Sequence, residues 1–151
     1  MNLDEMVTAY ISGTEHFLAV VGKLSVDDLD KSKTGGWTPR QIIHHVADSE
    51  AQSYARLRRL IAEPGTEISG YDEGGWGENQ TLGYRVLPIE NSLAVTAAVR
   101  SASADILKRV TQDQLANSCT HSESGEFTLE RWITVYSKHP VDHADQIIAE
   151  V

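Results

Sequence analysis

The sequence predicts an all-α protein, a four-helix bundle with a long crossover loop between its second and third helices. Three observations favour this fold. Four long stretches carry apolar side chains three and four residues apart, the spacing of an amphipathic helix. No stretch shows a convincing alternation of apolar and polar residues, as a half-buried strand would. A long connection separates the second stretch from the third, which is compatible with a crossover in a bundle.

The first predicted helix has a clear apolar stripe, and the second has a clear N-terminal start. The first is expected over about Leu3–Leu24. The second opens at Thr38, which can cap the helix, and Pro39 suits its first position. Gln41 completes a capping box with Thr38, and the helix is expected to end near Ala62. The apolar stripe of the first helix consists of Leu3, Val7, Tyr10, Ile11, Thr14, Phe17, Leu18 and Val21.

A long connection precedes the third predicted helix, and a second long connection separates the third helix from the fourth. The third is expected over Ile89–Val110, and the fourth follows Thr128, a good N-cap, and reaches the C-terminus. The crossover Pro64–Leu87 contains six glycines, and a loop of this length is more often functional than idle. The second excursion, Gln112–Phe127, is expected to hold one short helical turn. An up-down-down-up order of helices suits the long crossover.

Composition limits the classes of function. The 151 residues, without repeat or linker, are expected to form a single domain over residues 1–151. The net charge of −9 and the lack of a Lys/Arg cluster argue against binding to nucleic acid or to an anionic membrane surface. No apolar run approaches the roughly 18 residues of a membrane span, and the first residues do not resemble a signal peptide. One cysteine, Cys119, fits a reducing compartment, so we expect a cytoplasmic protein.

Helical phase separates the five histidines on predicted helices, of six in the chain, into inward and outward positions. With Trp132 at zero, His139 falls near ~340° and His143 near ~20°, inside or beside the apolar stripe of the fourth helix. Two buried imidazoles without partners are costly, and one metal ion would satisfy both. The alternative is that each imidazole forms a hydrogen bond across the core.

On the second helix, phase chooses between two adjacent histidines. His45 lies on the flank of the apolar face at about 300°, whereas His44 lies almost opposite the face at about 200°. His45 can therefore look into the bundle, and His44 is expected in solvent or at an interface. His16 lies opposite the stripe of the first helix and is expected to be an ordinary surface residue.

Three inward imidazoles form a recognisable set of metal ligands. Three histidines leave a fourth position for water, the open arrangement of catalytic zinc sites. A closed structural site would need a fourth protein ligand, for which Cys119 is the only sulfur candidate. Imidazole suits zinc, nickel, copper or ferrous iron. The spacing alone does not choose among these metals; we expect one divalent metal ion, and we name zinc or nickel.

Four motifs in order make the chain resemble the DinB/YfiT-like family of metal-dependent hydrolases. Single motifs are weak, but four at the right separations are specific. The resemblance covers nearly the whole chain from Gly36 onward. The motifs are Gly36-Trp37-Thr38-Pro39-Arg40-Gln41-Ile42-Ile43-His44-His45-Val46-Ala47-Asp48-Ser49, Tyr71-Asp72-Glu73 with Trp76, His121-x-Glu123-x-Gly125-Glu126-Phe127-Thr128-Leu129, and His139-x-x-x-His143.

The resemblance implies a four-helix bundle, often a homodimer, with one metal ion on three histidines. Carried over to this chain, the ligands are His45, His139 and His143, the same three that phase selects. The resemblance implies a hydrolase acting on a small-molecule substrate, or a transferase of low-molecular-weight thiols. Pro140 departs from the family pattern, because proline removes the amide that would bond the Tyr136 carbonyl and disfavours helical geometry at His139.

Several other residues are candidates for the reaction. A carboxylate should orient the nucleophile or accept its proton, and Asp48 and Asp142 are the nearest to the histidines in sequence. Tyr71 and Trp76 of the crossover are candidates to bind substrate, with a surface loop packed on its own aromatics as the alternative. A non-catalytic bundle that binds a metal or a small molecule is the alternative to an enzyme.

Phase also places two opposite charges on buried faces. Glu50 falls near ~80° on the second helix and Arg100 near ~20° on the third, each within an apolar arc. A buried carboxylate and guanidinium are far cheaper together than apart. We therefore expect Glu50 to pair with Arg100, or Arg100 to face the metal pocket and bind an anionic substrate group; the alternative is that each reaches solvent.

Overall fold

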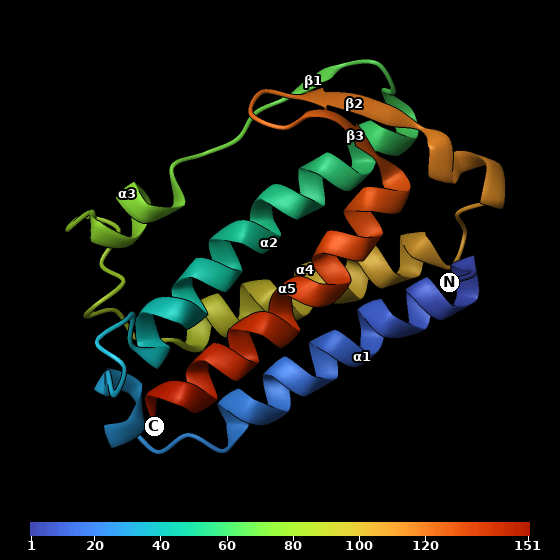
Figure 1. Cartoon of the computed structure of the whole chain (residues 1–151). Helices are drawn as coiled ribbons and strands as arrows, with labels where there is room; N and C mark the ends of the chain where they lie inside the picture. Colours follow the sequence, from blue (N-terminus) through green and yellow to red (C-terminus); the bar gives the residue numbers. More distant parts are fainter.

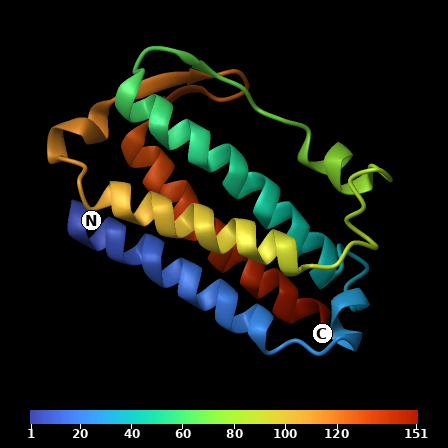
Figure 2. The same ribbon diagram turned by 180° about the vertical axis from the view of Figure 1, so that it is seen from behind.

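Four helices lie side by side and form the bundle (Figures 1 and 2). The computed structural model describes residues 1–151. The bundle helices are α1 (Leu3–Gly22), α2 (Pro39–Ala62), α4 (Glu90–Leu107) and α5 (Leu129–Glu150). The expected four-helix bundle is confirmed, and the largest difference in a boundary is at α4, which ends at Leu107 rather than at Val110.

Side chains fix where the helices begin. Thr38 and Gln41 form the expected capping box at the start of α2, with Pro39 in the first turn. The Thr128 hydroxyl accepts a hydrogen bond from the Arg131 amide, at 3.1 Å, and so caps α5. These caps satisfy amides that have no partner within the helix, and they set the phase of both helices that carry the metal-binding histidines.

The helices follow an up-down-down-up order. In Figure 1 the N-terminal ends of α1 and α5 lie at the same end of the bundle as the C-terminal ends of α2 and α4. A buried cluster at that end joins Tyr10, Leu60, Leu107 and Trp132 from the four helices. The parallel pairs α1–α5 and α2–α4 make the most extensive contacts. A second cluster fills the opposite end and contains Phe17, Val21, Ile42, Ile43, Val46, Ala144 and Ile147.

A small sheet covers the end of the bundle, and the expectation of a protein without strands was wrong. The strands are β1 (Glu67–Ile68), β2 (Ser118–His121) and β3 (Gly125–Thr128). β1 pairs parallel to β2, with Ile68 opposite His121, and β2 pairs antiparallel to β3. Strands this short show no alternation of apolar and polar residues that could predict them. The partner of β1 is β2, which lies in the second long connection of the chain. The sheet thereby ties the start of the crossover to the entrance of α5.

Three short helices complete the structure. They are the 3₁₀ helix η1 (Asp27–Asp30), the α-helix α3 (Glu73–Glu78) within the crossover, and the 3₁₀ helix η2 (Gln112–Ala116). η2 contains the helical turn expected near Asp113–Leu115. α3 packs against α2, so part of the crossover lies over the bundle (Figure 1). No helix combines the length and the apolarity that crossing a bilayer requires.

The expected pair of buried charges lies in the middle of the bundle. Arg100 Nη1 is 2.6 Å from Glu50 Oε1, and both side chains are fully buried. Burial raises the pKa of the Glu50 carboxyl, and the charge and hydrogen bond of Arg100 and the hydroxyl of Ser53 oppose that rise. The pair lies between the two apolar clusters and links α2 to α4.

Candidate metal centre

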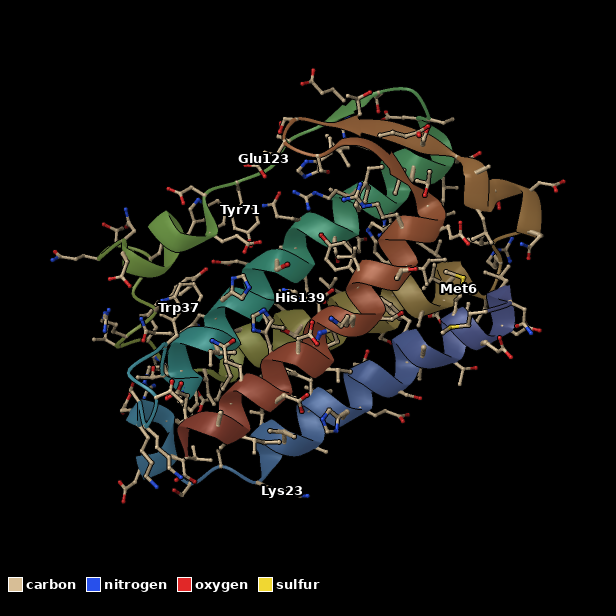
Figure 3. The ribbon with its side chains drawn as sticks, in the orientation of Figure 1. Met6, Lys23, Trp37, Tyr71, Glu123 and His139 are labelled. Carbon is tan, nitrogen blue, oxygen red and sulfur yellow. The ribbon has the colours of Figure 1, made fainter.

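Three imidazoles converge between α2 and α5. His45 Nε2 lies 3.1 Å from His143 Nε2, which in turn lies 3.1 Å from His139 Nε2. The ligand atoms of the three side chains all lie within 4.8 Å of one another. His139 and His143 are one helical turn apart on α5, and Figure 3 shows His139 beside α2. The structure therefore brings together the three residues that phase and resemblance selected.

The geometry of the three nitrogens fits a metal ion. Zinc–imidazole bonds of about 2.0–2.1 Å in a tetrahedral site separate the nitrogens by about 3.3 Å, close to the observed spacing. Gln146 Oε1 lies 2.8 Å from His143 Nδ1 and accepts a hydrogen bond from Nδ1–H, so that Nε2 of this ring offers a lone pair to the centre. The donor set is thus three nitrogens that point at one position.

Burial keeps the three imidazoles neutral. Desolvation, with a smaller contribution from the neighbouring His143, lowers the pKa of His45 to about 4 and that of His139 to about 2. Desolvation also lowers the pKa of His143, although Gln146 and Asp142 oppose the shift. Only neutral imidazole binds a metal. Protons therefore compete weakly with a metal ion for this site at neutral pH.

No fourth protein ligand joins the three histidines. The cluster contains no carboxylate or thiolate. Cys119 belongs to β2 and packs in the apolar cluster at the sheet end of the bundle, with its thiol near Thr66 and the Glu63 carbonyl. His139 and His143 are half-buried rather than enclosed. The site therefore has the open form, with room for an exogenous ligand.

Aromatic side chains from the crossover and from the segment before α2 flank the site. The Trp37 ring contacts His45 edge-on, with 5.4 Å between ring centroids. Gly77 of α3 lies directly against Trp37, because a Cβ there would be 2.3 Å from the ring. Tyr71 and Trp76 pack on each other at 4.6 Å, and the Tyr71 hydroxyl is buried without a partner. The crossover thus forms a wall beside the histidines (Figure 3).

The two candidate carboxylates have different surroundings. Asp48 is half-buried, and its Oδ2 accepts a hydrogen bond from the hydroxyl of the buried Tyr84. Asp142 is exposed and pairs with Lys138, with 3.4 Å between Nζ and Oδ2. The catalytic role of Asp142 stays a prediction: its carboxylate is exposed in a surface ion pair, and its charge acts on the neighbouring His143.

Arg100 is not a substrate-binding residue, and this part of the expectation was wrong. Its guanidinium is fully buried and donates to Glu50, to the hydroxyl of Thr14 and to the backbone carbonyls of Tyr10 and Tyr136. Nε, Nη1 and Nη2 all donate to partners within the bundle. The side chain is committed to holding the helices together.

Three histidines lie outside the cluster: His121 belongs to β2, and His16 and His44 differ from each other. His16 is exposed, as expected. His44 is buried, contrary to the expectation of a solvated residue, with Nδ1 2.7 Å from Ser92 Oγ and Nε2 3.1 Å from the Leu87 carbonyl. The end of the crossover and the start of α4 cover this face of α2, which the phase of α2 alone does not reveal.

A polar cavity of about 730 Å³ lies under the sheet on the same side of the bundle. Tyr136 connects it to the site, since its ring is 6.2 Å from that of His139 and its hydroxyl accepts a hydrogen bond from Arg56 at 3.0 Å. The cavity is lined by Arg56, Gly70, Tyr71, Asp72, Glu73, His121 and Glu123. It offers both donors and acceptors to a polar substrate.

Four residues of the site were given no functional role from the sequence, although Trp37 belongs to the first family motif. They are Trp37, Arg56, Tyr84 and Gln146. Gln146 follows His143 by three residues and so lies on the same helical face, a signal that could have been used. Trp37 precedes the N-cap of α2, where an apolar residue often packs back on the helix. Tyr84 reaches the site through the fold of the crossover, whereas Arg56 lies on α2 and donates to the Tyr136 hydroxyl and the Ser69 carbonyl.

The comparisons with known proteins agree with this geometry. The family model of the DinB superfamily matches residues 10–147. The chain belongs to this family, whose resemblance was apparent in its motifs.

Two relatives of this chain carry names that describe a metal-dependent hydrolase. The chain is 35% identical to "Putative metal-dependent hydrolase OB0782" of Oceanobacillus iheyensis over 82% of this chain and 71% of the relative. It is 30% identical to a "Putative metal-dependent hydrolase" of Bacillus cereus over 95% of this chain and 84% of the relative.

Two solved structures share the fold. YfiT from Bacillus subtilis, described as "a probable metal-dependent hydrolase with an unusual four-helix bundle topology", has a TM-score of 0.86 and 26% identity, over 97% of this chain and 83% of YfiT. The four-helix bundle protein TT2238 has a TM-score of 0.68 and 21% identity, over 98% of this chain and 99% of that one.

Proposed function

We propose that this protein is a metal-dependent hydrolase of small polar molecules. One observation carries the proposal: three neutral imidazoles converge on a single position that no other protein group fills. The names of the DinB-superfamily relatives support the same class of reaction. The polar cavity beside Tyr136 supplies room for a substrate.

The bound metal would supply two things, polarisation of a substrate oxygen and a lowered pKa of water, toward about 7. His45, His139 and His143 would hold it. Gln146 fixes the tautomer of His143 and keeps the ring oriented. Trp37 covers His45 on one side and excludes water there.

Asp48 is the best candidate for the general base. It lies on α2 one turn after His45, and Tyr84 holds one of its oxygens, which leaves the other free to accept a proton. Tyr71 is the best candidate to bind the substrate, because its buried hydroxyl has no partner and can donate to a substrate oxygen. Trp76 supports Tyr71 by packing against its ring.

The thiol transferase is the second candidate. It calls for a polar or cationic pocket for an anionic thiol, and Arg56 favours it. Asp72, Glu73 and Glu123 line the same cavity, however, and their negative charge opposes a purely anionic ligand. A non-catalytic bundle calls for a filled fourth position, and the open donor set opposes it. The hydrolase therefore remains the leading proposal.

The finer features of the proposal come from the chemistry of the donors and from the resemblance. Nitrogen donors favour zinc or nickel over magnesium or calcium, so we propose zinc or nickel as the ion. A homodimer and a cytoplasmic location complete the proposal. Light scattering after size-exclusion chromatography tests the dimer.

Chelation tests the function. The purified protein should carry close to one divalent metal ion per chain and should hydrolyse a member of a panel of small esters and amides. A chelator should abolish turnover, and added zinc or nickel should restore it. Asp48→Asn should lower kcat while retaining the metal. Absence of metal-dependent hydrolysis across the panel, with metal-dependent addition of a thiol to an electrophile, would favour the transferase.

A further inference from the structure

Pro140 lies in the interior of a continuous helix, directly after a metal-binding histidine. α5 is helical from Leu129 to Glu150, and Pro140 is buried within it. Proline has no amide hydrogen, so the carbonyl of Tyr136 loses its helical partner. A buried carbonyl without a hydrogen bond is costly. The turn of α5 that carries His139 therefore needs a donor from elsewhere.

Arg100 supplies that donor from a different helix. Its Nη1 donates to the Tyr136 carbonyl at 3.0 Å. The same nitrogen donates to Glu50 Oε1 at 2.6 Å, and Nη2 donates to the Tyr10 carbonyl at 2.9 Å. Arg100 is 1% exposed, so no water competes for these bonds. The guanidinium has a fixed, planar set of donors, and its position is therefore transmitted to the backbone of α5.

The helix is also held closely on its other side at this turn. A Cβ at Gly13 of α1 would lie 2.7 Å from the Ser137 carbonyl and 3.3 Å from Pro140 Cγ. The backbones of α1 and α5 thus meet where proline interrupts the hydrogen bonds of α5. Movement of the His139 turn toward α1 would require a clash, and movement away from α4 would break the bond to Arg100.

We propose that Arg100 is a positioning residue of the metal centre, which replaces the hydrogen bond lost at Pro140 and thereby sets His139 relative to His143. This inference rests on the proposed metal site. The Glu50 carboxylate holds the guanidinium in place and balances its charge. The buried ion pair of Glu50 and Arg100 thus helps to hold the turn of α5 that carries His139, although neither charge touches the metal position.

A double-mutant cycle between Arg100 and Pro140 tests the proposal. Glu50→Gln combined with Arg100→Met removes both charges and leaves the Tyr136 carbonyl without its donor. Pro140→Ala restores the backbone amide, which can bond the Tyr136 carbonyl directly. Nickel and cobalt affinities are measured for the wild type, Pro140→Ala, the charge-free variant and the combination. Visible spectra of the cobalt forms report the ligand geometry.

The expected result is coupling between the two positions. The charge-free variant should bind metal about 10–100-fold more weakly than the wild type, the range for loss of a group that orients a ligand. In the Pro140→Ala background the same substitutions should leave metal affinity and the cobalt spectrum nearly unchanged. An equal loss in both backgrounds, or no loss in either, would overturn the proposal, because only replacement of the hydrogen bond lost at Pro140 makes the effect of Arg100 on metal binding depend on Pro140.

Two further measurements keep the outcomes distinct. Ser53→Ala removes a hydroxyl that donates to Glu50 Oε2 at 2.9 Å but does not touch α5, so it is the matched control and should retain the metal affinity. If the charge-free variant does not fold, Arg100→Lys in the two backgrounds replaces it. If the wild type binds no metal, the proposed function fails, while the urea midpoints of the same proteins still reveal whether Arg100 and Pro140 are coupled; independent midpoints would refute the inference.

Discussion

Acid should destabilise the metal-free protein, because its buried histidines resist protonation. Desolvation holds the pKa of His45 at about 4 and that of His139 at about 2, against an ordinary value of 6.5. The unfolded chain therefore binds more protons than the folded chain as the pH falls below 6.5. By linkage, the free energy of unfolding decreases over that window.

The magnitude follows from the two shifts. At pH 5 each of these histidines is protonated in the unfolded chain and neutral in the folded chain. The ordinary pKa of 6.5 lies about 1.5 units above this pH, and each unit corresponds to about 1.4 kcal/mol. Each of the two histidines thus costs about 2 kcal/mol of stability at pH 5, and together they cost about 4 kcal/mol. This is a large part of the roughly 5–15 kcal/mol that stabilises a typical domain.

Urea unfolding of the chelated protein at pH 7.5 and pH 5 measures this loss. His45→Gln, which cannot titrate, should reduce the difference between the two pH values by about 2 kcal/mol. His16→Gln removes an exposed histidine and is the matched control. The reasoning is refuted if the His45→Gln protein loses as much stability on acidification as the wild type does.

Three other predictions concern the metal and the crossover. His143→Ala should strip the metal, as measured by elemental analysis, whereas His44→Ala should retain it and lose stability through its two buried hydrogen bonds; full occupancy in His143→Ala would contradict the site. Gln146→Ala should weaken metal affinity about 10–100-fold, and unchanged affinity in a competition titration would remove Gln146 from the support of His143. Gly77→Ala should displace Trp37 from its contact and raise KM for the substrate without loss of metal; unchanged kinetics would show that α3 does not shape the site.

The residues on long helices were predictable because their environment follows from helical phase. Phase chose His45 over His44 as the inward residue of α2, and it brought Glu50 and Arg100 together across the bundle. Both conclusions needed only the period of the helix and the cost of burying polar groups. Phase left open whether Arg100 pairs with Glu50 or binds an anionic substrate group, because it gives a direction but not the partners that use up the donors.

The connections were less predictable because their partners are distant in sequence. β1 has two residues, and it forms a strand only through its pairing with β2, so Glu67 faces Thr120 across the sheet. His44 is buried by Ser92 and the Leu87 carbonyl, which the phase of α2 cannot include. The contact of Gly77 with Trp37 likewise depends on where the crossover returns to the bundle. Each of these features is tertiary, and no local signal in the sequence encodes it.

The parallel pairing of the first and last helices has a consequence for synthesis of the chain. α1 makes its most extensive contacts with α5, so its apolar stripe lacks its main partner until α5 has left the ribosome. The metal ligands are divided in the same way, one on α2 and two on α5. A nascent chain therefore cannot assemble the three-histidine site early, and capture of the ion marks a chain whose bundle is complete.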